Sequence, residues 1–195
     1  DQYPLGNLIA EAFRAAARAD VAVVNNGGIR ADLPAGAVNW GALFEVMPFQ
    51  NFVVRMPVTG AVLRRAIEHA AAGGEARAHV SGVRVRVNPQ APPGARITAL
   101  TLEDGRPVED SARYTLAVPD FMAAGGSGYT MLRGLPAENT GTVDLDAFID
   151  YARRLPQPVR NLPTEPRVDD GTQPARARDD DPGLPNRPGR GRRRP

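Results

Sequence analysis

Hydrophobic positions along the chain follow a helical spacing in three segments. The first begins at Pro4, a residue suited to the first helical turn. The second follows Thr59, whose hydroxyl can cap it, and ends at Gly73-Gly74, while the third begins near Asp144. The apolar faces of these helices are Leu5, Leu8, Ile9, Ala12, Phe13 and Ala16; Val62, Leu63, Ala66, Ile67 and Ala70; and Leu145, Phe148, Ile149 and Ala152.

Short apolar runs and strict alternation predict strands between these helices. Residues 21–24 are a continuous apolar run, as expected for a buried strand. Valines and arginines alternate in residues 83–87, so the arginine face of that strand should be exposed to solvent. Further strands are expected at residues 52–58, from His79, at 97–102 and at 114–118, with a turn at Asp104-Gly105. The pattern predicts an α/β (α+β) fold, in which helices flank a mixed sheet that is largely antiparallel in its second half.

Length and charge place this fold within residues 1–169. A chain of 195 residues allows one domain and a tail. Residues 170–195 are rich in Pro, Gly and Arg and nearly lack apolar side chains, so we predict a disordered tail. The tail carries seven Arg and four Asp, against 17 Arg and 18 acidic residues in 1–169. The folded part therefore gives no indication of a nucleic-acid surface.

Residue types that are missing or rare exclude several kinds of chemistry. No cysteine is present, which removes disulfides, thiolate metal sites and a cysteine nucleophile. His69 and His79 lack carboxylates at metal-ligand spacing and are interpreted as surface or packing residues. We therefore predict no metal site and no catalytic residue in this chain. No apolar run approaches the roughly 20 residues of a membrane helix. The chain begins Asp1-Gln2-Tyr3, which indicates a processed product or an excised piece.

A polar, glycine-containing loop follows the first expected strand. Asn25 offers an amide that both donates and accepts, and Gly27 and Gly28 would let a ligand approach the backbone. Arg30 carries a planar guanidinium suited to phosphate or carboxylate oxygens. A tight loop with a surface arginine is the alternative interpretation.

Two further loops contain phenylalanine. Phe49 lies in Pro48–Asn51, and Phe121 precedes a loop with three glycines and Ser127. Each phenylalanine alone could be a core residue or part of a flexible loop. Together, two rings could stack on a flat heterocycle while Asn25 contacts its edge and Arg30 holds an anion. Stacking of a base on an aromatic side chain contributes about 1–3 kcal/mol.

At these loops the sequence resembles the C-terminal domain of the 5′-nucleotidase family, which includes UDP-sugar hydrolases and 2′,3′-cyclic-nucleotide phosphodiesterases. The resemblance covers residues 1–169 and leaves out the tail. It is carried by Leu5-Gly6-Asn7-Leu8, Asn25–Arg30, Pro48-Phe49, Val58-Thr59-Gly60, Val80-Ser81-Gly82, Asp120-Phe121 with Gly125–Tyr129, and Glu165–Val168.

The resemblance implies a substrate-recognition role. In the family this domain binds the nucleoside part, and an N-terminal metallophosphoesterase domain with two divalent metal ions hydrolyses the phosphate ester. Phe49 and Phe121 match the base-stacking pair, Asn25 matches the asparagine at the base, and Arg30 matches an arginine on the ribose or phosphate side. The family is periplasmic, attached to the cell envelope or secreted, so a nucleotide or nucleoside ligand and an N-terminal partner domain are expected.

Departures from the family pattern leave the function open in part. The catalytic domain lies outside this chain, so the chain alone should be inactive, and a further substrate-binding arginine would precede Asp1. Ser127 stands where the family has an aspartate that accepts hydrogen bonds from the ribose hydroxyls, and Asn26 replaces a glycine. A non-catalytic binding or scaffold module in an envelope or secreted protein is one alternative. A tail that tethers the domain to nucleic acid or an anionic surface is another.

Overall fold

The computed structural model describes residues 3–74, 77–160 and 162–170, and the predicted tail lies outside them apart from Asp170. In chain order the elements, with η marking short 3₁₀ helices, are α1 (Pro4–Ala17), β1 (Val21–Asn25), η1 (Asn26–Gly28), α2 (Trp40–Val46), β2 (Phe52–Thr59), α3 (Gly60–Ala71), β3 (Ala78–Ser81), β4 (Val83–Val87), β5 (Ile97–Leu102), β6 (Arg113–Pro119), α4 (Asp120–Ala123), η3 (Gly126–Gly128), η4 (Thr130–Leu132), β7 (Glu138–Val143), α5 (Asp144–Arg154) and β8 (Val168–Asp169).

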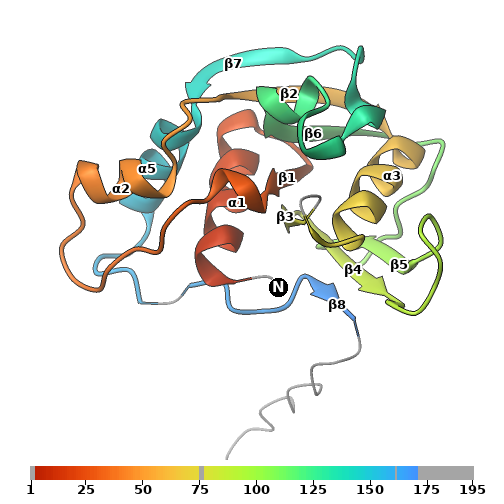
Figure 1. The fold of residues 1–195 in the computed structure, drawn as a ribbon, viewed down its shortest axis with the longest axis horizontal. Coiled ribbons are helices and arrows are strands. Elements are labelled where there is room, and N and C mark those ends of the chain that lie inside the picture. Colours follow the sequence, from red (N-terminus) through yellow and green to blue (C-terminus); the bar gives the residue numbers. More distant parts are fainter. Residues whose placement is uncertain (1–2, 75–76, 161, 171–195) are drawn as a thin grey trace, which may run out of the picture.

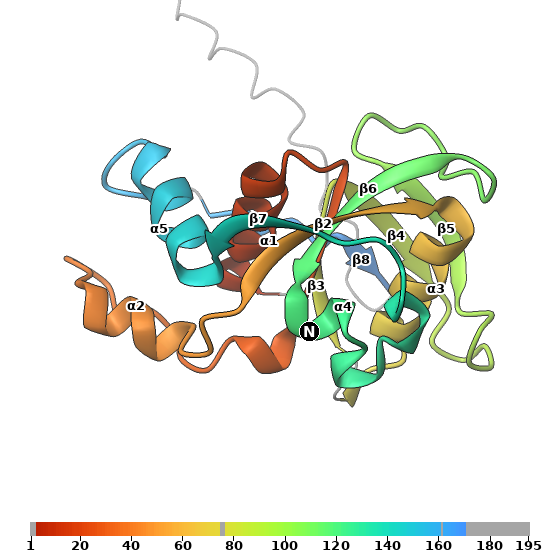
Figure 2. The same cartoon turned by 90° about the horizontal axis from the view of Figure 1, so that it is seen from above.

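Five strands form a mixed sheet in the order β3-β1-β6-β2-β7. β1 and β6 run parallel, and the remaining neighbours are antiparallel. In Figure 1, α1 and α5 lie toward the left of this sheet and α3 toward the right. A second sheet has the order β5-β4-β8, and Figure 2 shows β4 and β5 beside α3. The mixed α/β architecture predicted from the sequence is confirmed.

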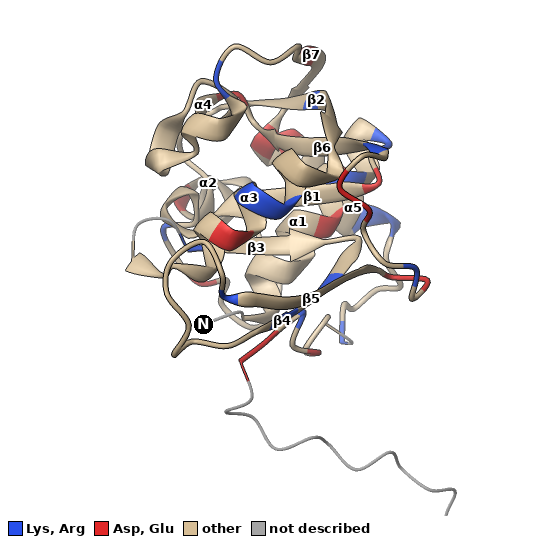
Figure 3. Cartoon of the chain, turned by 90° about the vertical axis from the view of Figure 1, so that its right-hand side faces the viewer, with Lys and Arg blue, Asp and Glu red and all other residues tan. Residues whose placement is uncertain are grey.

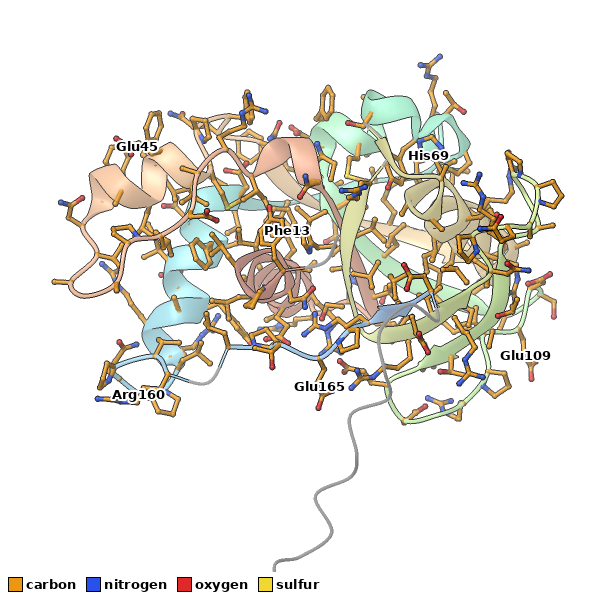
Figure 4. The ribbon with its side chains drawn as sticks, turned by 60° about the horizontal axis from the view of Figure 1, so that its bottom comes forward. Phe13, Glu45, His69, Glu109, Arg160 and Glu165 are labelled. Atoms are coloured by element: carbon orange, nitrogen blue, oxygen red, sulfur yellow. The ribbon has the colours of Figure 1, made fainter. Side chains whose placement is uncertain are left out.

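The five-stranded sheet separates two hydrophobic clusters. Because successive side chains of a strand point to opposite faces, Val21 and Val23 enter one cluster while Ala22 and Val24 enter the other. The first cluster joins the sheet to α3 and to the second sheet. The second joins it to α1 and α5, and Phe13 of α1 points into this interior in Figure 4. Both faces of the sheet are therefore covered.

The predicted helices and strands are confirmed within a residue or two of their expected ends. The cap of α3 is as expected, since the Thr59 Oγ1 accepts a hydrogen bond of 3.3 Å from the Val62 N–H. Several elements had not been predicted, namely α2, β7, β8, the short helix α4 and the 3₁₀ helices η1, η3 and η4, so the predicted loop after β6 contains helical turns. Helix α2 presents Trp40 and Phe44 stacked with their ring centroids 5.0 Å apart, and Trp40 is 60% exposed. A large apolar side chain on the exposed side of α2 obscures the usual separation of apolar and polar faces.

The last described residues return to α1 and close the fold. The buried guanidinium of Arg167 donates to the Val80 carbonyl at 2.8 Å and to the Asn7 carbonyl at 3.2 Å, and forms an ion pair with Glu11. The Asn7 Nδ2 in turn donates to the Pro163 carbonyl at 3.0 Å. These contacts fix the C-terminal segment across α1 and β3, which explains the pairing of β8 with β4.

Charges of both signs are interspersed on the described surface, as the blue and red segments of Figure 3 show. Arg84 and Glu165 form an exposed ion pair at 2.7 Å. Exposed pairs of this kind contribute about 0–1 kcal/mol, so the two apolar clusters dominate the stability. Within residues 3–170, gaps excepted, no helix has the length and apolar character to cross a membrane.

Candidate functional site

The predicted site residues gather at one edge of the five-stranded sheet. The carboxyl ends of the parallel strands β1 and β6 meet there: β1 ends at Asn25, and β6 is followed by α4. Strand β2 runs antiparallel to β6 with Val53 opposite Pro119, so the loop before β2, which carries Phe49, reaches the same edge. The topology thus brings together three loops that are far apart in the sequence.

Asn25 and Ser127 face one another at this edge. The side chain of Asn25 is 6% exposed, and its Nδ2 donates to the Ser127 Oγ at 3.5 Å. Gly27 and Gly28 follow Asn25 in η1, and a Cβ at Gly28 would lie 3.4 Å from the Asn25 Oδ1, an ordinary contact. The chain conformation alone does not demand glycine there. The absence of side chains instead leaves the surface beside Asn25 open.

Phe121 is held over a glycine at the start of η3. Its ring is 48% exposed, and a side chain at Gly126 would collide with that ring. The lack of a side chain at Gly126 therefore makes room for the Phe121 ring. From the sequence, this glycine-containing loop had been interpreted only as a flexible loop. Phe49 is 55% exposed, so neither phenylalanine is a core residue. Among the described aromatic contacts the two rings do not touch each other, which leaves both available to a ligand.

Arg30 lies beside Phe49 and away from the interior. Its Cζ is 6.0 Å from the centroid of the Phe49 ring, at the outer limit of a cation–π contact. Its Nη1 donates to the Gly27 carbonyl at 3.3 Å, and its main-chain N–H donates to the Val46 carbonyl at 2.8 Å. The guanidinium is exposed, so its other N–H groups can donate to an anion.

Two side chains that sequence analysis had not selected position these loops. The His69 Nε2 lies 2.8 Å from the Ser127 carbonyl, and His69 lies on α3 beside that loop in Figure 4. Ser127 itself has φ 51°, in the left-handed region. At the other loop, the Asn51 Nδ2 donates to the Asp144 Oδ2 at 3.2 Å. Burial raises the pKa of Asp144, although the Leu145 and Asn51 N–H groups stabilise its charge.

A family model for the C-terminal domain of 5′-nucleotidases matches residues 1–134 of the chain. The chain belongs to the 5′-nucleotidase family. This 5′-nucleotidase C-terminal domain is 34% identical over 173 residues to Endonuclease YhcR of Bacillus subtilis. It is 29% identical over 163 residues to the cell wall protein Lmo0130 of Listeria monocytogenes. The structure of a 5′-nucleotidase precursor from Thermus thermophilus superposes with a TM-score of 0.80 at 31% identity.

The chain spans only part of each of these proteins. The match covers 80% of this chain but 13% of the Bacillus protein, and 76% of this chain but 21% of the Listeria protein. For the Thermus structure the shares are 88% and 36%. The family assignment is thus a statement about one domain, and the family and fold expected from the resemblance are confirmed.

In this 5′-nucleotidase domain the candidate site exposes Arg30, Phe49 and Phe121. Two cavities, of about 240 Å³ and about 340 Å³, lie elsewhere, and none of the predicted site residues lines either of them. The described residues also contain no group of three or more His, Asp or Glu side chains that could hold a metal ion. His69 and His79 both lie in packed environments, against Tyr129 and Tyr3 respectively.

Proposed function

We propose that this chain is the nucleoside- or nucleotide-recognition domain of a 5′-nucleotidase-type metallophosphoesterase of the periplasm, cell envelope or secreted fraction. The observation that carries the proposal is the pairing of the Asn25 amide with the Ser127 hydroxyl at 3.5 Å, between loops that expose Phe49 and Phe121. A buried amide beside exposed rings suits a flat polar heterocycle, since the rings supply stacking area and the amide supplies a donor and an acceptor. The relation to a cell wall protein supports the location.

Each residue has a distinct part in this proposal. Phe49 and Phe121 stack on the base, Asn25 hydrogen-bonds its edge, and Arg30 contacts the ribose or phosphate side. Gly27 and Gly28 allow the ligand close to the backbone. In the whole protein, metal ions of an N-terminal domain would supply the activated water that attacks the phosphate ester. This domain would bind and orient the nucleotide for that attack.

Replacing Phe121 by alanine should weaken adenosine or AMP binding by about 1–3 kcal/mol, because one stacking surface is lost. The thermal midpoint should change little, because the ring is 48% exposed. Calorimetric titration of the chain with adenosine, AMP and UDP-glucose measures the affinity, and Phe49→Ala should behave alike. Phe52→Ala is a matched control, since that ring is 38% exposed but lies within β2.

Unfolding of Phe121→Ala without a change in affinity would make Phe121 a structural residue and remove it from the site. A well-folded chain that binds none of the three compounds would favour the alternative of a scaffold module. Repeating the titration with a chain extended upstream of residue 1 then separates an incomplete pocket from a lost one.

Replacing Ser127 by aspartate should strengthen binding of ribonucleosides relative to 2′,3′-dideoxynucleosides. The carboxylate can accept two hydrogen bonds from the ribose hydroxyls, whereas the serine hydroxyl cannot act as a bidentate charged acceptor. Aspartate also tolerates the left-handed backbone found at this position, where φ is 51°. Competition titrations of adenosine against 2′,3′-dideoxyadenosine measure the ratio. An unchanged ratio would contradict this account of Ser127.

A further inference from the structure

A buried histidine lies directly beneath the loop that carries Asn25. His79 is the second residue of β3, opposite Val24 of β1, and is 1% exposed. Neither hydrolysis nor base stacking, as proposed above, uses this side chain. Its position between α1 and η1 nevertheless gives it contacts to both.

The two ring nitrogens of His79 face two amide oxygens. The Nε2 lies 3.2 Å from the Asn26 Oδ1, and the Nδ1 lies 3.5 Å from the Asn7 Oδ1. A neutral imidazole carries one N–H and can donate to only one of them. We assign the ring proton to Nε2, which then donates to the Asn26 side chain, because that contact is the shorter of the two.

The ring of His79 has no room to move. Tyr3 packs its edge against the ring with the centroids 4.4 Å apart, and a side chain at Gly6 would collide with the ring from the side of α1. Asn7 is held by its own bond to the Pro163 carbonyl. Because the ring is fixed on these sides, the Nε2–H presents a fixed donor to the loop above it.

Asn26 is tied to the same part of the fold through its backbone. Its main-chain N–H donates to the Arg77 carbonyl at 2.8 Å, and its carbonyl accepts from the Ile29 N–H at 3.1 Å. Asn26 does not have a left-handed backbone conformation, so the tolerance of asparagine for that conformation does not explain why asparagine occupies this position. The side chain is bonded to His79 instead. The preceding residue, Asn25, donates from its side chain to the Ser127 hydroxyl.

We propose that His79 is a positioning residue for nucleoside recognition, whose Nε2–H fixes the Asn26 side chain and so sets the orientation of the neighbouring Asn25 amide. The inference rests on the proposed function, because it concerns the same ligand. Among the described residues, the charged and titratable groups near the ring are Tyr3 before α1, Arg77 before β3, and Arg167 of the C-terminal segment, which is paired with Glu11. The positive charges among them disfavour a second proton on the ring.

The first experiment needs no ligand. Ring ¹⁵N shifts of the full chain, labelled at histidine and recorded at about pH 8, above the usual histidine pKa of about 6.5, report which nitrogen carries the proton. We expect the Nε2–H form for His79, and a loss of that preference in Asn26→Ala. A His69→Gln variant assigns the two rings. A predominant Nδ1–H form in the unmutated chain would overturn the proposal.

The second experiment measures adenosine binding by calorimetry. Asn26→Ala and His79→Phe should each weaken binding roughly three- to tenfold, and the double variant should be no weaker than the weaker single one. Phenylalanine keeps a ring over Gly6, and Asn26→Ala tests the contact even if His79→Phe fails to fold. Asn88→Ala, which removes an exposed side-chain bond to the Gln90 N–H, is the matched control.

Normal binding by Asn26→Ala would overturn the positioning role. If the unmutated chain binds no adenosine, the proposed function fails and takes with it the part of the inference that concerns recognition. The ring tautomer and its response to Asn26→Ala still decide whether His79 holds Asn26, so the two failures are distinguishable.

Discussion

Replacing Arg167 by alanine is expected to lower the free energy of unfolding by about 3–5 kcal/mol, because it removes one partner of a buried ion pair. The Arg167 side chain is 7% exposed, and the change leaves Glu11 with only the Tyr151 hydroxyl and removes the hydrogen bonds from Arg167 to the Val80 and Asn7 carbonyls. Urea unfolding followed by circular dichroism measures the loss. The effect should be global, since Arg167 joins the C-terminal segment to both α1 and β3.

An exposed arginine on the neighbouring strand β4 provides the control. Arg84 pairs with Glu165 at 2.7 Å, but the two side chains are 47% and 73% exposed. Arg84→Ala should therefore cost no more than about 1 kcal/mol. Equal losses in the two variants would contradict the structural role given to Arg167.

The stability of the domain is expected to fall as the pH is lowered from about 6.5 toward 4, by about 3 kcal/mol in all. Burial lowers the pKa of His79 from 6.5 to about 4, and the charges of Arg167 and Arg77 act in the same direction. Between these two pH values the unfolded chain binds a proton that the folded chain does not. Protons therefore favour unfolding in this window. Above it His79 is neutral in both the folded and the unfolded chain, so it no longer lowers the free energy of unfolding.

Urea titrations at a series of pH values test this expectation. In His79→Phe the free energy of unfolding should lose most of its pH dependence in that window. His69→Gln leaves His79 in place, so it should keep that pH dependence. Carboxylates titrate in both variants and cancel in the comparison. An identical pH profile for His79→Phe and the unmutated chain would show that another group causes the loss of stability.

The parts of the fold that the sequence predicts are those whose buried positions form a clear pattern along the chain. The stripe containing Phe13 and the apolar run at 21–24 leave little choice of element, because only a helix or a buried strand hides those residues. Strand β7 has the sequence Glu-Asn-Thr-Gly-Thr-Val and lies at the end of the sheet, half exposed. Its stability comes from pairing with β2, and no local pattern reports such a partner.

The candidate site is predictable as a set of residue types but not as an arrangement. Asn25, Phe49 and Phe121 were selected from three loops, and the strand pairing that unites them is long-range. Their roles in binding stay predictions. His79 was interpreted as a surface or packing residue, and it is fully packed. Its contact with Asn26 could not be foreseen, because it spans 53 residues and depends on β3 lying against β1.

The family match ends at residue 134, but the fold does not. Strand β7 covers one side of β2, and α5 covers α1 with Leu145 and Phe148. A fragment cut at residue 134 would present the backbone of β2 as an open strand beside an uncovered apolar helix face. Such a strand is a template for joining other chains edge to edge. Solubility, and not only affinity, therefore sets where this domain can be divided.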